Sequence, residues 1–346
     1  MGTIRPDVPA LRHGSRARVA LLAIAATVAA AACGYGGGPS LDLRKVDVVA
    51  LPGKGIRFDY VSLDQVRHLL VVANLGDDEV VAVDTGQRRV AWRAGGVGSA
   101  HGVAVDTGTG RAYATATATN EVVALDEASG HKLFRSPTGP FPDGIAVDPF
   151  TATVWVSNKD GGSETVVDAA SGRAVATLPV GADTGNVMFE ASSRQMVVAV
   201  GQSNELVLID AGGTTINRRL ALPGCRGAHG LAVGPATVFV ACEDNATVVA
   251  FDPGSGRISG TGSTGATPDV LAFDSARERL YVAAEDGVVA AFDTQGGALA
   301  PRGKAKVASG AHTVAVDPTT GRVYLPLPNI GGHPGLEILE PLAPRD

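Results

Sequence analysis

The chain has few aromatic, charged or cysteine residues and lacks several motifs that identify enzyme families. Only 5% of its 346 residues are aromatic, 18% are charged and three are cysteine. It has no CxxCH motif, which excludes a covalently bound c-type haem. Neither a P-loop nor a G-x-S-x-G nucleophile elbow stands at a strand-to-helix turn, so P-loop nucleotide hydrolysis and serine hydrolysis have no support.

A membrane-spanning helix is also missing, and the N-terminal pattern is that of an export signal. Arg12, Arg16 and Arg18 precede an apolar run over residues 19–32. Its fourteen residues would form a helix of about 21 Å, too short for a bilayer core of about 30 Å. Basic residues, a short apolar run and small residues at its end are typical of a cleaved signal. We therefore expect residues 1–32 to be a signal peptide.

The residue after that signal is a cysteine in a setting that resembles a bacterial lipoprotein. Cys33 follows three alanines and precedes a glycine-rich stretch, so the resemblance implies a lipid on Cys33 and a tether over residues 33–40. Such signals usually carry Leu where this chain has Ala30, which leaves simple cleavage as the alternative. Either route predicts an exported protein, periplasmic or at the cell surface, touching the membrane only through a lipid anchor.

The charge balance excludes one class of partner. The whole chain has a formal charge of −6, and residues 1–32 hold four Arg and one Asp, so the remainder carries −9. An acidic domain without a basic patch repels phosphate backbones. We expect no nucleic-acid partner.

Glycine is abundant instead, with 45 residues, and it belongs to a repeat of about 42 residues. One short motif of the type His-Gly-Val-Ala-Val-Asp recurs seven times, at residues 59–64, 101–106, 143–148, 185–190, 229–234, 269–274 and 312–317. A second motif keeps the same spacing and ends at Asp84, Asp126, Asp168, Asp210, Asp252 and Asp293. Two different motifs that recur at the same spacing indicate a tandem duplication of one unit.

Each repeat predicts four short β-strands. Small and β-branched residues alternate in the first motif, and an Asp with Pro, Thr or Gly then predicts a hairpin turn. The repeated Asp-x-x-Ser-Gly loops at Asp126, Asp168 and Asp252 lack the dense carboxylates of a calcium loop, so we interpret them as turns as well. Four strands in about 42 residues are typical of a propeller blade.

These patterns predict an all-β, seven-bladed β-propeller of four-stranded antiparallel blades over residues 41–346. The repeat region begins with a strand over residues 45–51 that resembles the fourth strand of a blade but has no first three strands before it. It ends with a strand over residues 336–339 that resembles a third strand but has no fourth strand after it. We therefore expect the N-terminal strand to complete the last blade. Such closure removes exposed strand edges and favours a monomer.

Several motifs resemble the YVTN/YncE-type propellers of exported bacterial proteins. They are the segments at residues 120–126, 227–233, 280–284 and 321–326, within a resemblance that covers about residues 41–340. The resemblance implies a seven-bladed propeller and no particular reaction, since a fold does not supply a function.

The residues that open the first strand of each blade should meet at one mouth of the central channel. In ring order they alternate between His and Asp except in the fourth blade, where Asn186 stands beside Gly185; the candidates for ligand binding are Asp59, His101, Asp143, Asn186, His229, Asp269 and His312. Imidazole and carboxylate are ligands for transition metals, so a metal site is predicted for five of them: His101, His229, His312, Asp59 and Asp269.

Two interpretations of this ring remain open at the level of sequence. Its side chains either hold a ligand or metal ion, or brace the loops by bonding to backbone groups. The sequence assigns no catalytic residue, and we favour a binding scaffold for a protein or small ligand. The alternatives are a metal-dependent enzyme, lactonase-like or lyase-like, and a redox protein with a transition metal in the channel.

The two remaining cysteines fall in one blade. Cys225 lies just before a first strand and Cys242 follows the antiparallel second strand, so both reach the same end of one sheet. An exported protein can form a disulfide there, and closing a loop of this length contributes about 3 kcal/mol. Two free thiols, or a metal site that includes His229, are the alternatives.

Overall fold

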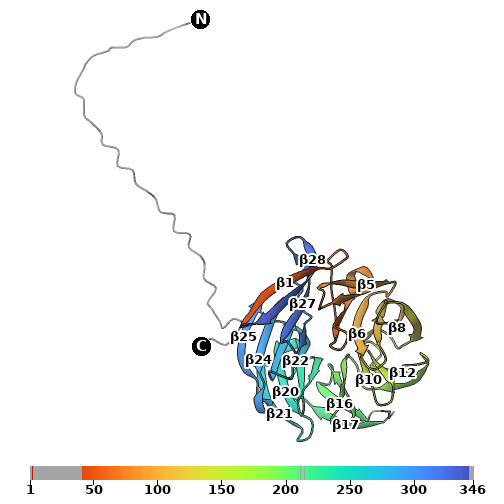
Figure 1. The fold of residues 1–346 in the computed structure, drawn as a ribbon. Coiled ribbons are helices and arrows are strands. Elements are labelled where there is room, and N and C mark those ends of the chain that lie inside the picture. Colours follow the sequence, from red (N-terminus) through yellow and green to blue (C-terminus); the bar gives the residue numbers. More distant parts are fainter. Residues whose placement is uncertain (1, 3–40, 211, 214, 343–346) are drawn as a thin grey trace. The chain divides into compact units, whose positions relative to one another are not determined.

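Seven four-stranded sheets stand around a common centre in the computed structural model, which describes residues 2, 41–210, 212–213 and 215–342 (Figure 1). Every pair of neighbouring strands is antiparallel, which confirms the seven-bladed propeller. The predicted signal peptide, the Cys33 lipidation site and the tether at residues 33–40 lie outside the described residues. No helix within the described residues is long and apolar enough to span a membrane.

The strands follow one another along the chain from the inside of each blade outward. Blade 1 contains β2 (Val61–Asp64), β3 (Leu69–Asn74), β4 (Glu79–Asp84) and β5 (Arg89–Gly95). Blade 2 contains β6 (Ala100–Asp106), β7 (Arg111–Ala116), β8 (Glu121–Asp126) and β9 (Lys132–Pro137). Blade 3 contains β10 (Pro142–Asp148), β11 (Thr153–Asn158), β12 (Ser163–Asp168) and β13 (Ala174–Pro179). Blade 4 contains β14 (Thr184–Glu190), β15 (Gln195–Val200), β16 (Glu205–Asp210) and β17 (Ile216–Ala221).

The remaining blades repeat this order until the last one. Blade 5 contains β18 (Ala228–Val233), β19 (Val238–Cys242), β20 (Thr247–Asp252) and β21 (Arg257–Ser263). Blade 6 contains β22 (Pro268–Asp274), β23 (Arg279–Ala284), β24 (Val288–Asp293) and β25 (Ala300–Lys306). Blade 7 contains β26 (Ala315–Asp317), β27 (Arg322–Ile330), β28 (His333–Pro341) and β1 (Leu43–Ala50). The described helical segments are single turns: η1 (Leu75–Asp77), η2 (Thr117–Thr119), η3 (Glu243–Asn245) and η4 (Gln295–Gly297).

In five of the seven blades an Asp at the end of the first strand forms the turn that the sequence predicts. The Oδ1 atom of Asp64 accepts hydrogen bonds from the backbone N–H groups of Val66 and Arg67, at 2.7 and 2.9 Å. The outer hairpins use the same device, since Oδ1 of Asp126 accepts from the N–H of Ser129 at 2.9 Å. The Asp-x-x-Ser-Gly loops are therefore hairpin turns, as expected.

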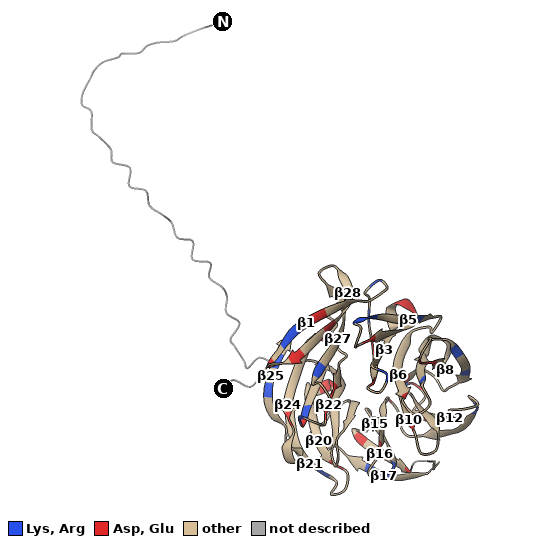
Figure 2. Ribbon diagram, in the orientation of Figure 1, with Lys and Arg blue, Asp and Glu red and all other residues tan. Residues whose placement is uncertain are grey.

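The hydrophobic core lies between blades rather than inside one of them. Seven apolar clusters occupy the seven blade-to-blade interfaces, and Trp155, which is fully buried, belongs to the cluster between blades 3 and 4. Both faces of each sheet are covered in this way, so the middle strands are mostly apolar. Lys and Arg instead lie on outer strands such as β1 and β25, where Figure 2 draws them in blue.

Blade 7 joins the two ends of the chain, as the sequence predicts. Strand β1 pairs antiparallel with β28, from Leu43 opposite Pro341 to Ala50 opposite Gly335, and the two strands lie side by side in Figure 1. Val49 and Leu51 enter the apolar cluster between blades 7 and 1. The N-terminal strand thus covers the edge of β28 and also contributes to the adjoining core.

One core position in blade 3 holds an acid. Glu164 is fully buried on β12, at the position that other blades fill with Val80, Val122, Leu206, Val248 and Val289. Its Oε1 accepts a hydrogen bond from Ser157 Oγ at 2.7 Å, and its Oε2 has no partner. Burial raises the pKa of Glu164 to about 8, so this carboxyl group holds a proton at neutral pH.

A matched pair of substitutions in β1 tests the closure. Val49 is 5% exposed and its neighbour Val48 is 37% exposed. We expect Val49→Asp to lower the thermal unfolding midpoint strongly, because it buries an unpaired charge in the closing interface, and Val48→Asp to change it little. Equal midpoints for the two variants would show that β1 does not carry the closing contact.

Because Glu164 is protonated in the folded chain, the free energy of unfolding should depend on pH. The substitution Glu164→Gln should remove this dependence. Between the ordinary pKa of 4.5 and about 8 the folded chain holds one more proton than the unfolded chain at this residue. The free energy of unfolding should therefore fall by about 1 kcal/mol per pH unit as the pH rises through this window. Urea unfolding of wild type and Glu164→Gln at several pH values checks this. A difference between the two proteins that stays constant with pH contradicts it.

Candidate functional site

The residues that open the first strands meet at one mouth of the central channel. Five of the seven predicted positions line a cavity of about 190 Å³ there: Asp59, His101, Asp143, His229 and Asp269. His312 joins them through its contacts with Asp59 and Asp269. Six residues that are far apart in sequence are thus brought together, because each occupies the same place in its blade.

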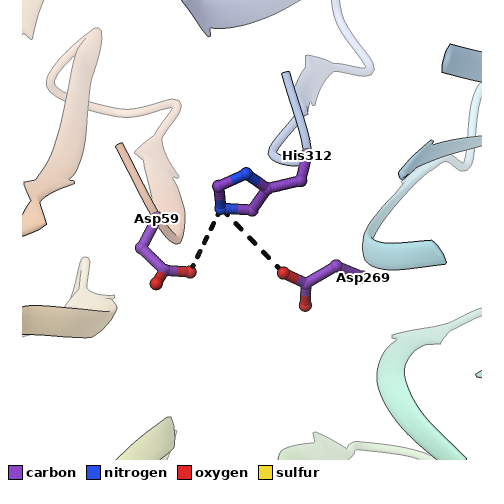
Figure 3. Close-up of side chains that lie close together, drawn as sticks. All are labelled: Asp59, Asp269 and His312. Atoms are coloured by element: carbon purple, nitrogen blue, oxygen red, sulfur yellow. Dashed lines mark ion pairs between the residues drawn. The ribbon is translucent and has the colours of Figure 1, made fainter. Parts of the chain in front are cut away.

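His312 stands between two carboxylates, as Figure 3 shows. Its Nε2 atom lies 3.6 Å from Oδ1 of Asp59 and 4.0 Å from Oδ2 of Asp269, both longer than a hydrogen bond. His312 is 1% exposed, and its Nε2 has no hydrogen-bond partner. Its Nδ1 contacts the backbone oxygen of Gly310 at 3.1 Å, which places the ring proton on Nδ1 in the neutral form and leaves the Nε2 lone pair facing the carboxylates.

His101 is held in the same way. Its Nδ1 lies 2.9 Å from the backbone oxygen of Ser99 and 2.8 Å from the hydroxyl oxygen of Thr117. Its Nε2 points to Oδ2 of Asp59 at 3.9 Å. In both rings one nitrogen is fixed by the protein and the other faces the cavity. Hydrogen bonding that braces the loops therefore explains the position of one ring nitrogen in each histidine, and it does not explain why the other nitrogen faces the cavity.

His229 and Tyr60 also line the cavity. The Tyr60 hydroxyl lies 3.1 Å from Oδ1 of Asp269, to which it donates, and 3.3 Å from Nε2 of His229. His229 Nε2 is also 3.9 Å from Oδ2 of Asp143. Burial, followed by the nearby charge of Lys159, lowers the pKa of His229, so its ring is neutral at neutral pH.

The fourth blade departs from the ring for a steric reason. A Cβ atom on Gly185 would lie 2.8 Å from the Cα of His229, so this position cannot hold a side chain while His229 stays in place. Asn186 lines a separate space of about 290 Å³ in the channel beneath. The structure thus places Asn186 beside the mostly apolar channel and outside the acidic cavity.

Four charged residues of the cavity were not among the sequence candidates: Arg57, Lys159, Glu243 and Glu285. Three of them directly follow the second strand of their blade, Lys159 after β11, Glu243 after β19 and Glu285 after β23. They are 84 and 42 residues apart, so they keep the period of the repeat. The same spacing, applied to the end of the second strand, would have found them.

The cavity has an excess of negative charge. Five carboxylates line it (Asp59, Asp143, Glu243, Asp269 and Glu285) against Arg57 and Lys159, which gives a formal charge of −3 with neutral histidines. Arg57 is engaged by Glu285, with nitrogen–oxygen distances of 2.9 and 3.3 Å. The remaining carboxylates are therefore only partly compensated.

Burial and this negative charge together shift the pKa values of the titratable groups in the cavity. Burial and the adjacent Asp59 raise the pKa of Asp269, and burial raises the pKa of Glu243 to about 7. Burial opposes the charged form of His312, but Asp59 and Asp269 outweigh it and raise the pKa of this ring. These three shifts favour uptake of a proton, those of Asp269 and Glu243 mainly because the groups are buried, whereas His312 and Arg57 outweigh burial and lower the pKa of Asp59.

The predicted disulfide is present and lies beside the site. Cys225 and Cys242 are bonded and buried. Cys242 ends β19, directly before Glu243, and its β-ladder partner Ala228 directly precedes His229. The bond therefore joins the two segments that place Glu243 and His229 in the cavity.

Comparison with known proteins supports the fold alone. No family model matches the chain, and no curated protein matches its sequence. A solved structure described as "Streptogramin B lyase structure" superposes with a TM-score of 0.70 at 12% identity, over 86% of this chain and 97% of that chain. At this identity the match shows a shared propeller architecture. The resemblance to YVTN/YncE-type propellers stays a prediction.

Removing the disulfide should loosen the blade that carries His229 and Glu243. In a chain that starts at residue 41, we expect Cys225→Ala combined with Cys242→Ala to lower the free energy of unfolding by about 3 kcal/mol. Urea unfolding measures this, and reductant should destabilise wild type but leave the double variant unchanged. Two free thiols in unfolded, unreduced wild type would show that the bond does not form.

Proposed function

We propose that this protein is an exported β-propeller that binds a divalent transition-metal ion at the mouth of its channel. Asp59, Asp269 and His312 would supply the ligand atoms. One atom from each lies within 4.8 Å of the others, and all three residues are buried. The proposal thereby narrows the wider expectation of a binding scaffold to one class of small ligand.

The observation that carries the proposal is the unpaired Nε2 of His312. A buried polar atom without a partner is costly, and this one faces two carboxylates across 3.6 and 4.0 Å. Two acceptor groups aimed at one lone pair repel one another unless a proton or a cation stands between them. A metal ion satisfies all three at once.

The donor set favours a first-row ion of intermediate hardness. One imidazole and two carboxylates suit Zn²⁺ or Mn²⁺, whereas sites for Cu(I) use sulfur ligands. Gly310 supports this role, because a backbone oxygen on Nδ1 orients a ligating histidine and fixes its tautomer. Arg57 contacts Asp59 and Asp269 only at 3.5 and 4.0 Å and is bonded more closely to Glu285. It can stay on Glu285 when the ion binds.

Export and lipidation at Cys33 belong to the same proposal. The Cys225–Cys242 bond supports an oxidising compartment, where disulfides persist. A partner protein or a further small ligand would approach from the open side of the mouth, where loops rather than strands present side chains. The second candidate is the metal-dependent, lyase-like enzyme that the sequence leaves open; a similar propeller is described as a lyase, and such an activity in this chain would use the same ion.

Metal binding is tested with protein stripped by chelator and titrated with Zn²⁺ in a calorimeter. We expect wild type to bind Zn²⁺, and His312→Ala to lose one Zn²⁺ per chain from the wild-type stoichiometry or to bind that ion at least about 100-fold more weakly, because even residues that only orient metal ligands contribute 10–100-fold. Asp59→Asn is the isosteric second variant and should weaken binding as well. Metal analysis after dialysis gives the bound amount independently.

His131→Ala is the matched control, because His131 is an exposed histidine outside the cavity. Its affinity for Zn²⁺ should equal that of wild type. Thermal unfolding of each variant shows whether it is folded. The proposal is wrong if folded His312→Ala binds Zn²⁺ as tightly as wild type, or if wild type retains no metal.

A further inference from the structure

Asp269 presents its two carboxylate oxygens to two different groups of ligands. Its Oδ2 faces His312 at 4.0 Å, on the side of Asp59. Its Oδ1 faces His229 at 3.7 Å, on the side of Glu243. The side chain therefore stands between two sets of potential ligands rather than within one.

The second set has the composition of a metal site. One ligand atom each from His229, Glu243 and Asp269 lies within 4.8 Å of the others, and Oε1 of Glu243 is 3.9 Å from Nε2 of His229. His229 and Asp269 are each 5% exposed. One imidazole and two carboxylates repeat the donor set of the first group, with Asp269 common to both.

We propose that the channel mouth holds two metal ions bridged by the carboxylate of Asp269. The first ion is bound by Asp59 and His312, as in the proposed function on which this inference rests. The second is bound by His229 and Glu243. Carboxylate-bridged ions in two-metal sites lie about 3.5–4 Å apart, a spacing that one Asp spans with its two oxygens.

The charge of the cavity agrees with two ions better than with one. A single divalent ion bound by Asp59 and His312 reduces the formal charge of the lining groups from −3 to −1 and leaves Lys159 as the positive charge that acts on Glu243. Asp183 adds a further negative charge that acts on His229 and Glu243. Asp244 also acts on Glu243, so with both residues included the formal charge is −5, most of which two divalent ions offset.

Tyr60 has a defined place in this arrangement. Its hydroxyl lies 3.1 Å from Oδ1 of Asp269, and the residue lines both the acidic cavity and the channel below. When an ion takes the Oδ1 lone pair that faces His229, the hydroxyl can donate to the other lone pair of the same oxygen. Tyr60 thus acts as a positioning residue that orients the bridge.

The number of ions per chain tests the inference. Stripped wild-type protein is loaded with Mn²⁺, and bound Mn²⁺ is counted by metal analysis and examined by electron paramagnetic resonance. We expect two ions per chain and the spectrum of an exchange-coupled pair. Glu243→Gln should bind one ion with the spectrum of an isolated Mn²⁺, and His229→Gln should do the same by a separate substitution.

Asp244→Asn is the matched control, because Asp244 is exposed on the same turn as Glu243. It should keep two ions and the coupled spectrum. One ion per wild-type chain overturns the two-metal inference and leaves the proposed function intact. Two coupled ions in folded Glu243→Gln overturn the second site as assigned, and absence of any bound metal overturns both proposals.

Discussion

Each blade of this propeller has two apolar faces, and only a neighbouring blade on each side can cover them. This packing requirement governs the rest of the structure. Seven clusters fill seven interfaces, so the ring must close, and closure requires that β1 joins the blade formed by the C-terminal strands. Small inner residues follow from the same requirement. A Cβ on Gly230, for example, would overlap the backbone oxygen of Asp269 in the next blade.

Closure concentrates charge at the channel mouth. Because equivalent residues of successive blades converge there, a carboxylate that would be harmless on one blade meets carboxylates from several others. Arg57 and Lys159 offset part of this charge, and protonation offsets more where pKa values are raised. The tertiary structure thus creates a site in which carboxylates outnumber positive charges. For this reason a cation is the ligand class that the geometry favours.

The disulfide and the anchored imidazoles place the same groups with little freedom. His101 and His312 each use Nδ1 on a backbone oxygen, and the Cys225–Cys242 bond fixes the segments around His229 and Glu243. Ligand atoms held in place before binding require less ordering when an ion arrives. A rigid ring with preset donors suits metal binding, whereas the shared fold with a solved lyase structure does not by itself transmit that activity.

The sequence alone predicted the seven blades and their turns, because these depend on local chemistry repeated at a fixed period. It predicted the closing strand from the incomplete repeats at the two ends of the repeat region, and the cysteine pair from the position of both residues at one end of a single blade. It also identified the His and Asp positions of the ring, since the first strand of every blade faces one axis. Only the tertiary structure decided which of them share a cavity. Position 185 adds no side chain to it because His229 fills the space beside Gly185, and Glu243 enters it because the end of β19 reaches the same mouth. Distances between side chains on different blades depend on packing across interfaces, and no pattern along a single chain encodes them.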